Sequence, residues 1–422
     1  MQEKMSFGNA DNKKDSIIGY FGEVKDTTKN IIKVIGVGGG GCNVVNNMYI
    51  EGMDSVSFAV CNTDSKSLAA SPVPVKIMLG KSGLGAGANP EKGRADAEES
   101  IDSIRKLFED STQMVYVVAT LGGGTGTGAG PFVASIAREK GLLTIGIVTL
   151  PFYFERRPKI IKALKGLEKM RKSVDALLII NNQQISNVYK DSHIRLDEAF
   201  HNADMVTANS VRGISELITL HGKIQIDFSD VKTTMQNGGG AIMAIGRASG
   251  EKRVQNALLN ALDSPLLYGT DISKATRILL NIYTSMEHQL YVDEIGEIDA
   301  FMDELNPDID VIWGMTTDDS LGEDAKITIV ATGIDNTLPE IAHNAESDEA
   351  YDEIIDALYG QRGCRTDATG KSGGEGLNKE PEVYSTDEQK DYKQNNDPAK
   401  KFLERVKARI INTLNMIMTP DE

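Results

Sequence analysis

Short apolar stretches alternate with longer segments of mixed polarity through the first half of the chain. Where apolar positions run together or alternate we predict strands, and over most of the segments between them we predict helices. The strands predicted in this way are Lys33–Val37, Val56–Asn62, Val75–Leu79, Met114–Leu121, Leu143–Leu150 and Ala176–Asn181. Strands that alternate with helices indicate an α/β domain with a parallel sheet, which we place at residues 30–199.

Helical spacing replaces this alternation between residues 200 and 221. Apolar residues recur there three or four positions apart, which predicts one long central helix. They are Phe200, Ala203, Val206, Val211, Ile214 and Leu217. A second set of segments then predicts a smaller α+β domain at residues 222–334. Its expected strands are Gly240–Arg247, Arg277–Ser285, Asp310–Thr316 and Ala325–Thr332, and its expected helices are Lys252–Asp263 and Val292–Leu305.

The two ends of the chain lack the pattern of a packed core. Residues 1–29 are expected to form a disordered arm, and residues 335–399, rich in Gly, Ser, Asn, Lys and Glu, a disordered linker. Residues 400–422 form a basic amphipathic tail, with apolar residues at helical spacing between Phe402 and Ile417. A helix of about 16 residues is marginal in water, so we expect the tail to fold on binding a partner.

Charge and composition narrow the class of protein. A net charge of −16 disfavours nucleic acid as a partner, and the start of the chain and its apolar runs predict neither a secretion signal nor a transmembrane segment. Three cysteines without paired spacing fit reduced thiols in the cytoplasm. The five histidines have no metal-ligand spacing, so no protein metal site is predicted.

Glycine loops after the predicted strands carry the candidate chemistry. "VIGVGGGGCN" fits Gly-x-Gly-x-x-Gly through Gly36, Gly38 and Gly41, and Asp64 follows about 23 residues later, as in nicotinamide-dependent oxidoreductases. That interpretation leaves "TLGGGTGTGAGP", Thr120–Pro131, without a purpose. Backbone N–H groups of such a loop at a helix N-terminus cradle several phosphate oxygens.

Two further features of these loops define the ligand. Gly80-Lys81-Ser82 matches the end of a Walker A motif, but Val75 stands where that motif needs glycine. Ala86–Asn89 instead makes a third loop of small residues after a strand. Several such loops at successive strand ends predict a polyphosphate that lies across the carboxyl edge of the sheet.

These motifs carry a family resemblance. "GVGGGGCN", "NTD", "GLGAGANPEKGRADAE", "GGGTGTGAGP", "PFYFE", "ADMV", "IDFSDVKTTM" and "SPLL" resemble, in this order, the cell-division GTPases of the tubulin/FtsZ superfamily, over about residues 31 to 334. The resemblance implies GTP/GDP and Mg²⁺ as cofactors and a homopolymer of head-to-tail filaments that forms the division ring. It also implies a cytoplasmic location at the division site, and a tail that binds membrane tethers and regulatory division proteins.

The resemblance also assigns roles to single residues. Glu155 would contact the ribose, and Asn182 and Asp204 the guanine edge, where a carboxylate suits the N1–H and N2–H donors; read from spacing alone, Asp204 could be a surface acid. Which of Arg156, Arg157 and Lys159 reaches the nucleotide stays open. The candidate nucleotide-binding residues are Gly38, Gly39, Gly40, Gly41, Asn43, Asp64, Ala88, Asn89, Gly123, Gly124, Thr125, Gly126, Thr127, Gly128, Glu155, Lys159, Asn182 and Asp204.

The candidate catalytic residues lie beyond the central helix. Asp227 and Asp230, spaced by three before an apolar helix, fit a helix cap by pattern alone. The resemblance implies instead that one subunit inserts this loop into the nucleotide site of the next and polarises the attacking water. Gln225 stands where the family commonly has asparagine, and the tail matches the family's tether-binding peptide only loosely. The alternatives to a self-assembling GTPase are a nicotinamide-dependent oxidoreductase and a non-catalytic tubulin-like scaffold.

Overall fold

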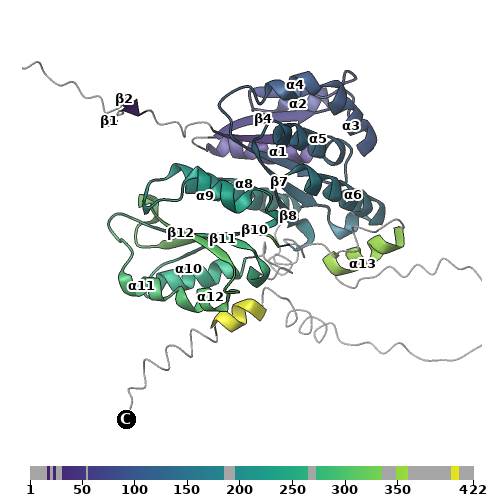
Figure 1. Ribbon diagram of the computed structural model, residues 1–422. Coiled ribbons are helices and arrows are strands. Elements are labelled where there is room, and N and C mark those ends of the chain that lie inside the picture. Colours follow the sequence, from purple (N-terminus) through teal and green to yellow (C-terminus); the bar gives the residue numbers. More distant parts are fainter. Residues whose placement is uncertain are drawn as a thin grey trace, which may run out of the picture.

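The structure is a computed structural model that describes residues 17–19, 22–24, 31–53, 56–184, 195–264, 272–334, 348–359 and 401–407 (Figure 1). Its main feature is one 11-stranded sheet in the order β5-β4-β3-β6-β7-β8-β10-β13-β11-β12-β9. The first half of the chain supplies the strands from β5 to β8, and the second half supplies the others. A parallel pairing of residues 176–178 with 239–241 joins the two halves.

The first half is the parallel α/β domain that the sequence predicts. All pairings among its strands are parallel. The strands are β3 (Ile32–Val37), β4 (Val56–Asn62), β5 (Val75–Met78), β6 (Met114–Thr120), β7 (Leu143–Leu150) and β8 (Ala176–Asn181). The helices are α1 (Gly38–Glu51), α2 (Ser65–Ala70), α3 (Pro90–Glu99), α4 (Ile101–Lys106), α5 (Thr125–Glu139) and α6 (Arg157–Ser173).

Helices cover both faces of this half of the sheet (Figure 1). Every residue of β3 and of β7 is buried, as expected for parallel strands that meet no water on either face. One apolar cluster joins Val34 and Val118 to α1 and to the central helix. A second cluster joins Val117 on the opposite face to α5 and α6. The strand ends that carry the glycine loops are therefore fixed between two packed layers.

The central helix α8 (Leu196–Thr219) leads into the second half. It begins four residues before the predicted Phe200. The second half of the sheet is mixed, because β13 runs antiparallel to both of its neighbours, β10 and β11. Its strands are β9 (Gly222–Ile224), β10 (Gly239–Ala248), β11 (Arg277–Thr284), β12 (Asp310–Thr317) and β13 (Ala325–Thr332), and its helices include α9 (Phe228–Met235) and α10 (Arg253–Leu262).

The predicted helix Val292–Leu305 is wrong as a single element. The structure has two short helices there, α11 (Val292–Gly296) and α12 (Asp299–Glu304). The break lies at Glu297, whose carboxylate accepts a hydrogen bond from the backbone N–H of Gln255 at 3.0 Å. The N–H groups of Glu297 and Ile298 bond three residues back, to the carbonyl oxygens of Glu294 and Ile295, and end α11, while the Glu297 carboxylate bonds to the first turn of α10. The short strand β9 was not predicted, since a three-residue strand carries no periodic pattern.

The disordered linker predicted for residues 335–399 is wrong for part of its length. Helix α13 (Asp348–Tyr359) lies against α6 of the first half (Figure 1). Tyr351, Ile354 and Ile355 are buried there, and Leu358 is partly buried, which is the three- and four-residue spacing of a helix face. The many acidic residues between them conceal that spacing in the sequence. In the predicted N-terminal arm, the strands Ile17–Gly19 and Gly22–Val24 pair antiparallel.

The prediction that the tail folds only on a partner is wrong for residues 401–407. They form a helical segment whose Phe402, Leu403 and Val406 are buried in the apolar cluster of the second half. Phe402 packs edge-to-face on Phe301 of α12, with ring centroids 5.9 Å apart. The rest of the predicted tail lies outside the described residues. Among the helices that the structure describes, none is long and apolar enough to span a bilayer.

Candidate functional site

The first two glycine loops lie against one another at the starts of α1 and α5. A Cβ on Gly38, which has φ +77°, would stand 2.6 Å from the backbone nitrogen of Gly126. On Gly40 it would stand 2.2 Å from Oγ1 of Thr120, and on Gly41 2.3 Å from the carbonyl oxygen of Val118. Only glycine permits this approach without displacement of the backbone. Two helix N-termini are thereby placed at neighbouring strand ends.

Both helix starts are open toward a ligand. Neither α1 nor α5 has a side-chain cap, so the first N–H groups of each helix have no side-chain acceptor. A Cβ on Gly39 or Gly123 would meet no atom within 4 Å. Two adjacent helix N-termini with open space at these positions form a strong binding site for an anion. This arrangement fits the phosphates of a nucleotide.

Threonines stabilise the main loop from within. Thr127 accepts a hydrogen bond from the N–H of Gly122 at 2.8 Å, and the hydroxyl groups of Thr125 and Thr63 lie 2.7 Å apart. The three threonines and Gly122 are all buried. The motifs did not identify Thr63 as a site residue, although it lies in "NTD". Gly124, Gly126 and Gly128 belong to the same packed turn, with Gly128 lying against Pro90 of α3.

Several candidate residues have a local structural role. The side chain of Asp64 caps α2 by accepting from the N–H groups of Lys66 and Ser67, and these hydrogen bonds lower its pKa. Asn89 caps α3 in the same way, next to Ala88, which has φ +56°. Asn43 is exposed on the second turn of α1. The nicotinamide alternative needs Asp64 at a ribose, whereas its carboxylate is engaged with its own helix.

The segment after β7 brings Glu155 and Lys159 together. Glu155 lies in a 3₁₀ turn (Tyr153–Glu155); one carboxylate oxygen accepts from the N–H of Phe152 at 3.0 Å, and the other pairs with Lys159. A Cβ on Gly122 would lie 2.9 Å from the Lys159 side chain, so Lys159 lies beside the main glycine loop. Arg157 instead forms an ion pair with Asp352 of α13. Of the three cations left open by the sequence, Lys159 thus lies next to that loop and Arg157 pairs with α13.

Asn182 and Asp204 lie on different elements. Asn182 is buried, and within the described part of the chain its side-chain oxygen has no hydrogen-bond partner. Asp204 on α8 accepts a hydrogen bond from the Asn47 amide at 3.1 Å. Burial raises the pKa of Asp204 to about 6, against the opposing effects of nearby His201 and of that hydrogen bond. Asn47, one turn after Asn43 on α1, was missed because it belongs to no motif.

Asp227 and Asp230 form the cap that their spacing allows. Asp227 accepts from the N–H of Asp230, and Asp230 accepts from the N–H of Asp227, each at 2.9 Å. This reciprocal pair starts α9. Asp227 and Gln225 are exposed, while Ile226 between them is buried. Because β9, at the far edge of the sheet, leads into this loop, the acids lie in the other half of the sheet from the glycine loops.

Protein acids do not form a metal centre in the described residues, where no group of three or more His, Cys, Asp or Glu side chains could hold an ion. A divalent cation would therefore depend on ligands from a bound phosphate.

Comparison with known proteins agrees with this geometry. The model of the Tubulin/FtsZ family GTPase domain matches residues 31–190, and that of the FtsZ family C-terminal domain matches residues 239–335. Cell division protein FtsZ of Porphyromonas gingivalis is 50% identical over 309 residues, which cover 72% of this chain and 67% of that protein. The Aquifex aeolicus protein of the same name is 42% identical over 305 residues, 71% of this chain and 82% of that one.

Solved structures give the same result. An empty FtsZ dimer from M. jannaschii matches with a TM-score of 0.66 and 37% identity, over 74% of this chain and 90% of that one. The GDP-bound monomer of CetZ1 from Haloferax volcanii, at 21% identity and a TM-score of 0.62 over 75% of this chain and 99% of that one, shares the fold. With both domains matched and a relative 50% identical over 309 aligned residues, the chain belongs to the FtsZ family, the tubulin-like GTPases that act as GTP-dependent cytoskeletal proteins in cell division.

Proposed function

We propose that subunits of this chain assemble head to tail into the filaments of the division ring, and that GTP is hydrolysed at each junction. One observation carries the proposal. The glycine loops lie in the first half of the sheet, whereas Gln225, Asp227 and Asp230 follow β9 at the edge of the second half. One subunit therefore holds the nucleotide and the next supplies the carboxylates. The FtsZ dimer among the similar structures is consistent with such a pairing.

The first half has the groups needed to bind GTP or GDP. The uncapped starts of α1 and α5 would receive the phosphates, with Lys159 beside them. Glu155 would bind the ribose, and Asn182 and Asp204 the guanine. The unpartnered oxygen of Asn182 and the acceptor carboxylate of Asp204 suit the two N–H donors of that base. Mg²⁺ would bind with the phosphates, where it neutralises charge during transfer.

The second half would supply the groups that activate water. Asp227 and Asp230 each use one carboxylate oxygen in the cap, which fixes their orientation at the start of α9. Inserted into the next subunit's nucleotide site, a carboxylate can orient a water and accept its proton as the oxygen attacks the γ-phosphorus. The bond to the β-γ bridging oxygen then breaks, and GDP and phosphate result. Gln225 would help to position the same water.

An exposed apolar surface next to this loop supports the junction. Met286, Tyr291, Val292 and Ile295 have exposed fractions of 58%, 68%, 86% and 40%. They belong to the segment between β11 and α12, which Lys223 of β9 contacts through Gln289. Apolar side chains grouped beside a functional loop are typical of a surface that another protein covers.

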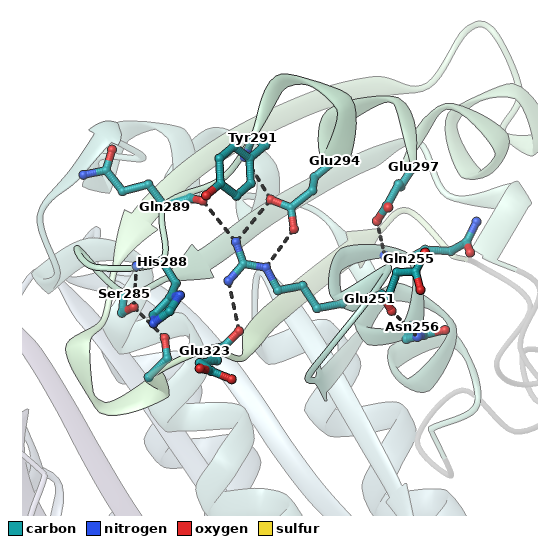
Figure 2. A network of polar contacts seen from close by, with 12 residues as sticks. Glu251, Gln255, Asn256, Ser285, His288, Gln289, Tyr291, Glu294, Glu297 and Glu323 are labelled. Atoms are coloured by element: carbon teal, nitrogen blue, oxygen red, sulfur yellow. Dashed lines mark hydrogen bonds and ion pairs between the residues drawn. The ribbon is translucent and has the colours of Figure 1, made fainter.

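A buried arginine holds this segment in place. Arg253 donates to the Glu294 carboxylate at 2.7 and 3.1 Å, and to the carbonyl oxygens of Gln289 and Glu323 at 3.0 and 2.9 Å (Figure 2). Its side chain is 7% exposed. The surface is therefore a rigid platform, which lowers the cost of ordering it against a partner.

The finer cellular role follows from these assignments. We place the protein in the cytoplasm at the division site, as a homopolymer that membrane-tether and regulatory division proteins recruit through the tail. A nicotinamide-dependent oxidoreductase is not compatible with the family. A non-catalytic scaffold of the same fold would bind GTP without releasing phosphate. A phosphate-release assay therefore separates it from a GTPase.

A mixing experiment tests the shared site. The Asp230→Ala chain has an intact nucleotide site, and a chain with Gly124→Val and Thr125→Ala has intact acids. Neither should hydrolyse GTP alone, whereas a mixture should release phosphate, since some junctions combine the two intact parts. Activity per subunit of the wild-type chain should also rise steeply with concentration. Equal turnover per subunit by dilute monomer, or a mixture as inactive as its components, would contradict hydrolysis between subunits.

A further inference from the structure

Helix α13 reaches the two segments that carry the nucleoside-binding residues. Its last residue, Tyr359, donates a hydrogen bond from its hydroxyl to the carbonyl oxygen of Pro151 at 2.8 Å, and its ring lies 5.9 Å from that of Tyr153. Pro151 begins the segment that leads to Glu155. The end of a helix far along the chain therefore packs on the start of the proposed ribose-binding segment.

The same helix end contacts the second segment. The carbonyl oxygen of Leu358 accepts hydrogen bonds from the side-chain amides of Asn181 at 3.2 Å and Gln184 at 3.4 Å. These two residues flank Asn182, the proposed guanine contact. The two segments are also joined directly, because Gln183 accepts from the N–H of Tyr153 at 3.1 Å. Leu358 and Tyr359 thus lie where the ribose and guanine segments meet.

The rest of α13 is anchored to α6. Ile354 is fully buried and Tyr351 is 3% exposed within the apolar cluster of the first half. Asp352 binds Arg157 through two hydrogen bonds, at 2.6 and 3.0 Å. Burial of this face fixes the helix, so its C-terminal end can hold the two segments in place.

The ribose segment needs such support. Arg156 has φ +77°, a left-handed conformation that costs energy in a residue with a side chain. Glu155, immediately before it, is held by the N–H of Phe152, the neighbour of Pro151. Contacts on both sides of the turn therefore determine where the Glu155 carboxylate lies.

We propose that α13 positions the nucleoside-binding segments, with Tyr359 as a positioning residue for the guanosine part of GTP and GDP. The inference rests on the proposed roles of Glu155 and Asn182. Residues beyond the second domain thereby set the nucleotide affinity of the first. The glycine loops pack against α3, against strand carbonyls and, at Gly122, against Lys159 of α6, so α13 contacts the nucleoside-binding segments directly and the phosphate loops only through α6.

The test compares nucleotide affinity in full-length variants. Tyr359→Phe removes the hydroxyl and keeps the ring, and we expect it to raise the GDP dissociation constant about two- to tenfold, the usual effect of one lost hydrogen bond. Tyr359→Ala should have a larger effect. Asp356→Asn, on the exposed side of the same turn, is the matched control and should bind GDP like the wild type. Turnover at saturating GTP should stay unchanged in Tyr359→Phe.

Two additional measurements separate positioning from loss of structure. The loss of affinity should be smaller for 2′,3′-dideoxy-GDP, which lacks the hydroxyls that Glu155 would bind; an equal loss for both ligands would overturn the inference. Glu155→Gln tests the site itself. If Glu155→Gln weakens GDP binding while Tyr359→Phe and Tyr359→Ala do not, α13 has no positioning role and the site stands. If none of them weakens it, the role of Glu155 fails, and the inference with it.

Discussion

At the nucleotide end of the sheet, two strand-to-helix turns approach so closely that Gly38, Gly40 and Gly41 leave no room for a side chain, whereas at the other edge Asp227 and Asp230 lie at an ordinary capped helix start. The glycines are fixed by contacts within one chain. Each acid accepts a hydrogen bond from the backbone N–H of the other, which is an ordinary cap and does not by itself distinguish catalysis from capping. A site built within a chain can be recognised from that chain, whereas a site completed by a neighbour has to be tested in the assembly.

The largest expected effect separates capping from catalysis at Asp230. Asp230→Ala should lower GTP turnover by about 10²-fold, the usual loss when a positioned proton acceptor is removed, and should leave GDP affinity unchanged. Asp230→Asn keeps an oxygen that can accept from the N–H of Asp227 but loses the charge. It should therefore retain thermal stability and still lose turnover. Phosphate release and thermal unfolding measure the two properties.

The control at Asp230 is its exposed neighbour Ser229, where Ser229→Ala should leave both properties unchanged. If Asp230→Asn turned over GTP like the wild type, Asp230 would be a helix cap only.

Two glycines of the first glycine loop test the nucleotide end of the sheet. A Cβ on Gly41 would overlap the carbonyl of Val118, so Gly41→Ala should destabilise the unliganded protein. A Cβ on Gly39 meets no protein atom, so Gly39→Ala should leave its melting temperature unchanged. GDP affinity should nevertheless fall about 5- to 150-fold, as one overlapping methyl group costs roughly 1–3 kcal/mol. Titration calorimetry that found wild-type affinity for Gly39→Ala would show that no phosphate lies there.

Protonation of Asp204 should change GDP affinity by a factor similar to that of a glycine substitution in the loop. Its folded-state pKa of about 6 lies above the ordinary 3.8, so ionisation costs stability, and the unliganded protein should lose stability as pH rises from about 4 to 6. Guanine needs the ionised form, so GDP affinity should change in the opposite direction and be about tenfold weaker at pH 5 than at pH 7. Asp204→Asn should abolish this pH dependence. An equal dependence in that variant would assign it to another group.

The strands of the sheet could be predicted because burial on both faces leaves continuous apolar runs, as in β3 and β7. The glycine loops could be recognised because few other turns need so many residues without side chains. The same lack of side chains lets the loops pack closely and leaves room for a phosphate. The sequence did not reveal the contacts that tertiary packing creates. Asn47 reaches Asp204 only because α1 and α8 lie on the same face of the sheet. Helix α13 was missed because acidic residues interrupt a four-residue apolar face.

Variants of the tail test whether the second half of the sheet affects GTP turnover only through Asp227 and Asp230. Of the changes considered, they should alter turnover least. Phe402 packs on Phe301 of α12, and Arg405 pairs with Glu304, so residues 401–407 belong to the second half. Phe402→Ala should lower the unfolding free energy by about 3–5 kcal/mol, because it removes a buried aromatic side chain and leaves a cavity. Glu404→Ala, at a side chain that is 64% exposed, is the control and should have no effect.

Deletion of residues 400–422 should leave GTP turnover and polymerisation intact while recruitment to a membrane-bound partner is lost. Of this stretch, residues 401–407 pack on α12 and the apolar cluster of the second half, whereas the proposed junction lies at β9 and at the segment between β11 and α12. Phosphate release and light scattering after addition of GTP measure turnover and assembly in the truncated chain. If truncation also abolished phosphate release, residues 401–407 would be required for the shape of the junction. GTP hydrolysis would then depend on other parts of the second half in addition to Asp227 and Asp230.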